Sequence, residues 1–172
     1  MIPELICIVI LSLFLFLFIF NSTIYPWFLA KKYNHEKSLV IPVSAGELFD
    51  KIAILNIKKD KINDKDKLQV IEKELKILED IKIDFIGIPT NFEFNGLYEE
   101  LHDLNLKLWD AEEMFRTKDE KKEYDDEFVK CAKLDISLND KRFVVKRRIN
   151  DFFDSQIKEV KSYKESILNR IT

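Results

Sequence analysis

The stretch SAGELFDKIAILNIKKDKI, residues 44–62, carries the clearest fold signal in the chain. Its first four residues form a capping box, in which the Ser44 hydroxyl accepts a hydrogen bond from the third helical amide and the Glu47 side chain reaches back. Apolar residues then recur at helical spacing: Leu48, Ile52 and Leu55. The stretch therefore predicts an amphipathic helix that starts at a defined residue and buries one face against other helices.

The chain after this stretch continues the helical pattern. Apolar residues recur with helical spacing in four further segments, at about 66–82, 97–116, 126–153 and 155–169. Mixed-charge stretches separate them, and the segment 83–96, which contains Gly87 and Pro89, predicts irregular backbone. The whole chain has only 3 Gly and 4 Pro, as expected for long helices with few turns. We therefore predict an all-α fold, an antiparallel bundle of four to five helices.

The N-terminus is more hydrophobic than any other part of the chain. Residues 5–20 read LICIVILSLFLFLFIF. Extended to Ile24, this run approaches the length of a bilayer-spanning helix, and Tyr25 and Trp27 are aromatic anchors at headgroup depth. The predicted parts are a transmembrane anchor over 1–24, a juxtamembrane stalk over 25–40 and a helical domain over 41–170. A cleaved signal peptide is the alternative, although it would carry basic residues ahead of the apolar run, where this chain has Glu4.

Charge predicts the orientation and disfavours one class of partner. Lys31, Lys32 and Lys37 follow the apolar run, and no Lys or Arg precedes it. The positive-inside rule therefore predicts a single-pass membrane protein with its helical domain on the cytoplasmic side. The chain has 28 Lys and Arg against 31 Asp and Glu. Because nucleic-acid-binding domains are usually basic, no nucleic-acid partner is expected.

The sequence contains no motif that predicts an enzyme. It lacks a glycine-rich phosphate loop and the CxxC, HExxH and GxSxG patterns. His35 and His102 are far apart in the sequence, as are the two cysteines, Cys7 and Cys131. We therefore expect no metal site, no cofactor and no disulfide framework.

A group of polar residues coincides with predicted helix seams. Arg142 shares a helical face with Val145 and Ile149, and a buried arginine needs a carboxylate partner. Two interpretations remain open: an internal network that fixes helix register, or a pocket in which Arg142 and Lys146 bind a phosphate or carboxylate. The candidate residues are Glu47, Asp50, Lys51, Asn139, Asp140, Arg142, Lys146 and Asn150.

A basic run follows the same helix. Residues 141–148 read KRFVVKRR and contain five cations. On a membrane-anchored domain, Lys146, Arg147 and Arg148 are candidates for contact with anionic lipid headgroups. The alternative is a basic helix face that is balanced by the acidic residues of 119–127.

Four segments form a pattern that resembles a known family. They are PVSAGELFDKIAIL (42–55), LKLWD (106–110), NDKR (139–142) and EVKSY (159–163), joined by Lys146, Ile149 and Asn150. The pattern resembles an uncharacterised bacterial family, one of the domains of unknown function, over roughly residues 41–163. The resemblance implies a link to surface-polysaccharide and glycosyltransferase genes. Members of that family start near the PVS element, so the hydrophobic N-terminus is a departure.

Two functions follow from these features. The first is a membrane-anchored helical adaptor or scaffold, linked to surface-glycan assembly, whose partners are the membrane and another protein. The alternative is a small binding domain or enzyme for an anionic metabolite such as a nucleotide sugar.

Overall fold

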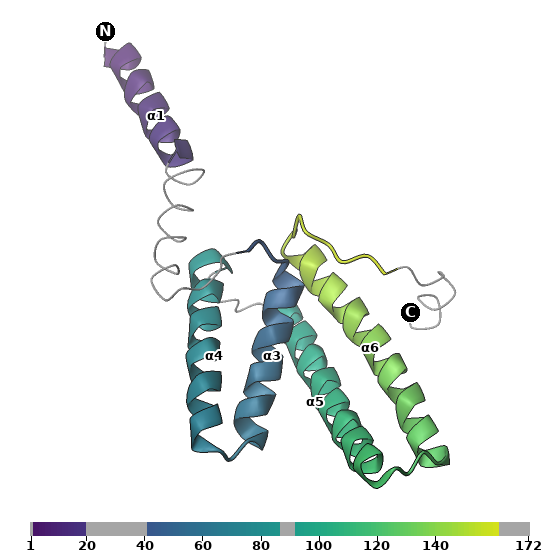
Figure 1. The fold of residues 1–172 in the computed structure, drawn as a ribbon. Coiled ribbons are helices and arrows are strands. Elements are labelled where there is room, and N and C mark those ends of the chain that lie inside the picture. The colour runs from purple at the N-terminus through teal and green to yellow at the C-terminus, as the bar shows by residue number, and fades with distance from the viewer. Residues whose placement is uncertain (1, 20–40, 87–91, 162–172) are drawn as a thin grey trace. The chain divides into compact units, whose positions relative to one another are not determined.

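The computed structural model describes residues 2–19, 41–86 and 92–161, and this part of the chain is all-helical (Figure 1). Its helices are α1 (Ile2–Ile19), α3 (Ala45–Lys61), α4 (Lys65–Ile86), α5 (Phe92–Lys121) and α6 (Asp126–Phe152). The chain divides into two compact units, Met1–Pro42 and Val43–Thr172. The all-α prediction is confirmed for the described residues, and the second unit contains the predicted helical bundle.

The predicted transmembrane helix over residues 1–24 is not confirmed. The helix α1 has 18 residues, which gives a rise of about 27 Å against a hydrocarbon core of about 30 Å. Among the residues described, none of the helices combines the length and the apolar character that crossing a bilayer requires. The large apolar side chains between Ile10 and Ile19 are 45–70% exposed. The predicted stalk, residues 25–40, lies outside the described residues.

The helix α3 begins where the capping pattern predicts. Ser44 has extended backbone angles, and its side chain accepts a hydrogen bond from the Glu47 amide at 3.2 Å. The second half of the predicted capping box is wrong, because the Glu47 carboxylate binds Lys146 of α6 instead of reaching back to Ser44. The start of α3 is therefore tied to α6 as well as capped.

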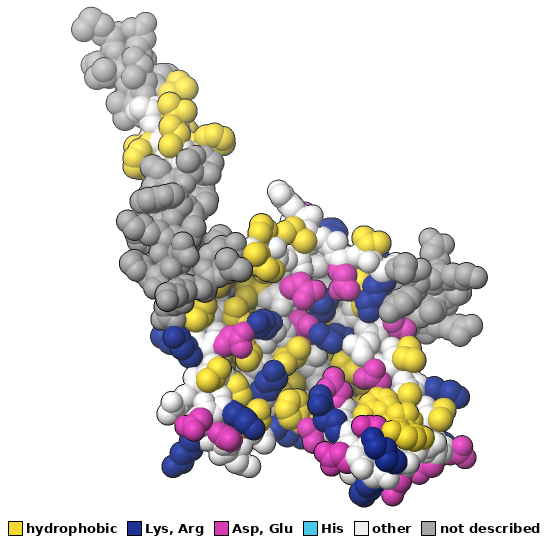
Figure 2. All heavy atoms as spheres, viewed as in Figure 1, with side chains coloured by type: hydrophobic (Ala, Val, Ile, Leu, Met, Phe, Trp, Pro, Cys, Tyr) yellow, Lys and Arg dark blue, Asp and Glu magenta, His cyan; other side chains and the backbone are white. Residues whose placement is uncertain are grey.

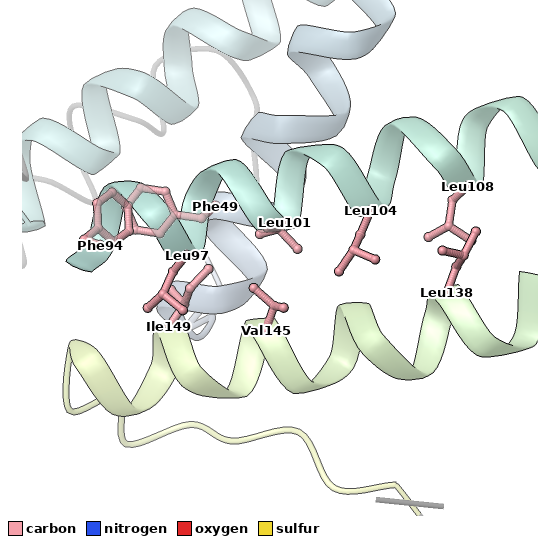
Figure 3. Packing of buried hydrophobic residues seen from close by; sticks show 9 residues of the cluster. All are labelled: Phe49, Phe94, Leu97, Leu101, Leu104, Leu108, Leu138, Val145 and Ile149. Atoms are coloured by element: carbon pink, nitrogen blue, oxygen red, sulfur yellow. The ribbon is translucent and has the colours of Figure 1, made fainter. Parts of the chain in front are cut away.

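The second unit consists of two helical hairpins, α3–α4 and α5–α6 (Figure 1). Helix α3 packs against α4, α5 and α6, and α5 packs along α6. Leucines of α5 interdigitate with apolar residues of α6, and Phe49 of α3 joins them (Figure 3). The main core cluster comprises Phe49, Phe94, Leu97, Leu101, Leu104, Leu108, Leu138, Val145 and Ile149.

Helical structure extends further into residues 83–96 than the sequence predicts. Helix α4 continues to Ile86 and α5 already begins at Phe92, and residues 87–91 lie outside the described part. Phe94 stands three residues before Leu97 and seven before Leu101, and all three side chains are buried. Helix α5 therefore begins about one turn before Gly96, where the sequence predicts irregular backbone. Burial of the Phe94 side chain outweighs the low helix propensity of glycine.

The helical segment predicted from residue 155 is wrong as far as residue 161, where the described part ends. Helix α6 ends at Phe152 in a Schellman motif: Asp154 has φ 48°, and the Ser155 amide donates to the Asn150 carbonyl at 2.8 Å. The left-handed residue turns the chain out of the helix, and residues 157–161 continue without helical hydrogen bonds.

Candidate functional site

Polar side chains from α3, α5, α6 and the segment after α6 meet in one network in the second unit. We define the α3–α6 network by its residues: Glu47, Asp50, Asn105, Asn139, Arg142, Lys146, Asn150 and Glu159. Asp50 lies on the face of α3 that carries the buried apolar residues, so its carboxylate is buried between the helices. Only 4% of its side chain is exposed.

Asp50 and Arg142 form the centre of the network. Arg142 donates from Nε to Asp50 Oδ1 at 2.8 Å and from Nη2 to Oδ2 at 2.6 Å, which is the bidentate geometry that a guanidinium and a carboxylate prefer. Asn105 of α5 donates to the same Oδ1 at 2.9 Å, and Arg142 Nη1 donates to Asn139 Oδ1 at 3.2 Å. The hydrogen bonds to Asp50 raise the pKa of Arg142 above its ordinary value, so the guanidinium stays charged at all ordinary pH values.

Lys146 lies close to three carboxylates, two on α3 and one in the segment after α6. Its Nζ lies 2.5 Å from Glu47 Oε1, 3.4 Å from Glu159 Oε2 and 3.9 Å from Asp50 Oδ2. The Lys146 side chain is only 10% exposed, and this surplus of negative neighbours compensates for its desolvation. The network thus contains two cations and three carboxylates.

The chain after α6 folds back along that helix. Lys158 Nζ lies 2.7 Å from Asp151 Oδ1, and Lys161 Nζ lies 5.0 Å from the centroid of the Phe143 ring. Glu159 reaches Lys146 between these two contacts. Residues 155–161 therefore run antiparallel to α6 and supply the third carboxylate of the network.

The helices α3 and α6 are in close contact at Gly46. Its amide donates to Asn150 Oδ1 at 2.6 Å, which satisfies one of the amides that a helix start leaves without a partner. A β-carbon at position 46 would lie 2.5 Å from the Lys146 carbonyl oxygen and 2.9 Å from Asn150 Oδ1. The contact with a backbone atom leaves no room for any side chain.

We therefore expect Gly46→Ala to destabilise the second unit by about 1–3 kcal/mol, the usual cost of overpacking. Gly96→Ala is the matched control, because a β-carbon there meets nothing within 4 Å and alanine should stabilise α5 by about 0.5–1 kcal/mol. Urea unfolding of both variants measures the difference. Equal effects of the two substitutions would contradict the close approach.

Six of the eight candidate residues from the sequence come together in this network. Two do not: Lys51 forms a surface ion pair with Glu74 at 2.7 Å, and Asp140 lies on α6 without a contact to the network among the described residues. Sequence reasoning missed Asn105 and the role of Glu159. Glu159 belongs to the EVKSY segment of the family pattern, which was the available signal, whereas no pattern singled out Asn105.

The predicted basic patch is divided by the fold. Lys146 points into the α3–α6 network, and Arg148 Nη1 pairs with Glu100 Oε2 of α5 at 2.8 Å. Arg147 is exposed. The three cations therefore do not form one lipid-facing surface, although contact of Arg147 with headgroups stays a prediction.

The network is complete within the chain. Among the described residues, every buried side-chain nitrogen and oxygen has a hydrogen-bond partner, and no group of His, Cys, Asp and Glu side chains could hold a metal ion. Because its carboxylates outnumber its cations, the network as described attracts a further cation rather than an anion. This geometry favours the structural interpretation.

The family model described as "Family of unknown function (DUF6165)" matches residues 39–170. No curated protein and no solved structure matches the chain. The matched region contains the whole α3–α6 network.

Proposed function

Because the chain belongs to a family of unknown function, DUF6165, we propose a function from its own geometry: a helical adaptor that is held at a membrane by its N-terminal segment and binds a protein partner. The proposal joins three features of the chain. They are an exposed apolar helix, a helical domain whose buried polar groups are satisfied internally, and the lack of a catalytic motif in the sequence.

The observation that carries the proposal is the surface of α1. Nine large apolar side chains between Ile10 and Ile19 are exposed to at least 45%, and Ser12 is the one polar residue in that stretch. Each side chain of this size gains about 1.5–3 kcal/mol when it leaves water. A helix that is apolar on all sides is stable only where all of its faces are shielded from water, and lipid hydrocarbon surrounds such a helix completely.

The α3–α6 network supports an adaptor over a binding domain for an anionic metabolite. Arg142 and Lys146 are the cations that would hold a phosphate, and both already bind carboxylates within the chain. A ligand that displaced Asp50 from Arg142 would leave this buried carboxylate without its partner, which costs several kcal/mol. The same contacts tie the start of α3 to α6, a structural role.

Flotation of the full chain with phosphatidylcholine vesicles tests the anchoring. We expect the protein to float, and we expect Leu13→Lys/Leu17→Lys to remain in the soluble fraction, because a lysine in hydrocarbon costs about 2.5–3.5 kcal/mol. Leu134→Lys/Ile136→Lys is the matched control, since both residues are exposed apolar positions of α6. A wild-type chain that stays soluble would refute the anchor.

The proposal also specifies the side of the membrane on which the helical domain lies and the class of its protein partner. Lys31, Lys32 and Lys37 favour the cytoplasmic side for the domain. The resemblance to a family linked with surface-glycan genes makes enzymes of glycan assembly the first protein partners to test.

A further inference from the structure

The connection between α5 and α6 forms a second distinctive surface, far from the α3–α6 network. We define the α5–α6 tip as residues 112–129, which include the end of α5, the turn and the start of α6. Phe128 and Lys146 are 18 positions apart on α6, a rise of about 27 Å. Changes at the tip therefore leave the network intact.

Exposed apolar and aromatic side chains gather at the tip. Tyr124 is 57% exposed, and Met114 and Val129 are also exposed. The Phe128 ring packs edge-on against Phe115 at 5.1 Å and against Tyr124 at 5.3 Å. Figure 2 shows hydrophobic side chains at this end of the α5–α6 hairpin, with charged side chains around them. An exposed patch of aromatic side chains with charged residues around it is typical of a protein-binding surface.

Ion pairs and hydrogen bonds connect the end of α5, the turn and the start of α6. Lys118 is buried, and its Nζ lies 2.8 Å from Asp125 Oδ2 and 2.7 Å from Glu127 Oε2. Asp125 also caps α6 by accepting from the Phe128 amide at 3.0 Å, and Tyr124 donates to Asp119 at 2.6 Å. A surface that is ordered before binding loses less conformational entropy when a partner arrives.

Negative charge surrounds the aromatic patch. Residues 112–129 contain eight Asp and Glu against four Lys and Arg, a net charge of −4, compared with −3 for the whole chain. Lys118 is already neutralised by its carboxylate neighbours. Glu120 and Asp126 are exposed and form no ion pair within the described part of the chain, so their charges are available to a partner.

We infer that the α5–α6 tip is the docking surface for a Lys- and Arg-rich protein segment that carries an apolar anchor residue. The anchor would pack on Tyr124 and Phe128, whose rings are in contact and where aromatic rings also attract cations. The basic side chains would face the carboxylates and accelerate association. An anionic membrane surface is repelled by the same charge. This inference rests on the proposed adaptor role, because it specifies the chemistry of the protein partner.

Synthetic peptides measure the preference directly. The full chain, in phosphatidylcholine nanodiscs, is titrated into three labelled 15-residue peptides, and binding is followed by fluorescence anisotropy. The first peptide is rich in Lys and Arg with one Trp and one Leu, the second has Glu in place of the cations, and the third is basic with Ser in place of Trp and Leu. We expect the first peptide to bind at least about ten-fold more tightly than either of the others.

Two variants locate the binding surface. Glu120→Lys/Asp126→Lys should abolish the ten-fold preference, and Tyr124→Ser should weaken the first peptide more than the third. Asp60→Lys/Glu99→Lys reverses two exposed carboxylates outside the tip and should leave binding unchanged. Equal affinities for the basic and acidic peptides, or equal effects of the two charge reversals, would overturn the inference. So would a dimer of the chain that the tip reversal dissociates, because the occupant would then be a second copy.

The outcomes separate this inference from the anchor. A chain that floats with vesicles but shows no charge preference keeps its anchor and loses the docking surface. A chain that does not float refutes the anchor, and its titration in buffer still tests the tip: a preference for the first peptide supports the docking surface.

Discussion

Replacement of Asp50 by leucine is expected to lower the free energy of unfolding by about 3–5 kcal/mol, the usual cost of removing one member of a buried ion pair. The substitution leaves the Arg142 guanidinium, whose side chain is only 26% exposed, without its bidentate partner. It also removes the acceptor of the Asn105 amide. Urea unfolding followed by Trp109 fluorescence measures the loss, with Trp27→Phe in every variant so that one tryptophan reports on the domain.

The double variant Asp50→Leu/Arg142→Met separates the two interpretations of the network. Replacing both charges with apolar side chains of similar volume removes the uncompensated charge, so we expect it to recover most of the stability that Asp50→Leu loses. Asp103→Leu is the surface control, because Asp103 forms only an exposed pair with Lys107, and its effect should stay below about 1 kcal/mol. If Arg142→Met alone left the stability unchanged, the structural interpretation would fail and an anion site would again be the better hypothesis.

Helix periodicity predicted that Arg142 needs a carboxylate partner and placed Asp50 among the candidate residues, but it did not choose between Asp50 and Glu47. Arg142 shares a face with apolar residues of α6, and Asp50 lies within the capped, apolar start of α3. A charged residue on a buried face requires a partner, so the number of candidates was small. The same reasoning gave the leucine stripe of α5, which forms much of the core.

The parts of the network that the sequence did not predict depend on how separate helices and segments pack. Asn105 is buried only because α5 crosses α3 next to Asp50, and no periodicity within α5 reveals that neighbour. Lys51 was included in the site because it belongs to the family pattern, but its side chain pairs with Glu74 of α4. The position of Glu159 follows from the left-handed Asp154, a single backbone conformation that outweighs the apparent helical pattern after residue 155.

Phe49→Ala should be about as destabilising as the loss of Asp50, with an expected cost of about 3–5 kcal/mol. Phe49 is 2% exposed, and its ring lies 4.7 Å from that of Phe94 and 5.5 Å from that of Phe153. It therefore joins the starts of α3 and α5 to the residue that follows α6. Truncation would remove these contacts and leave a cavity, because three separate elements cannot all move inward to fill it.

Phe92→Ala provides the matched comparison, since Phe92 is 92% exposed at the start of α5 and its truncation should change the stability by no more than about 0.5 kcal/mol. The two substitutions delete the same atoms from the same kind of residue, so the difference between them isolates burial. Phe49 also directly precedes Asp50, and loss of its ring should loosen the carboxylate that orients Arg142. We therefore expect the combined effect of Phe49→Ala and Asp50→Leu to differ from the sum of the single effects by more than about 0.5 kcal/mol. Strict additivity in the same urea experiment would show that the aromatic cluster and the α3–α6 network stabilise the fold independently.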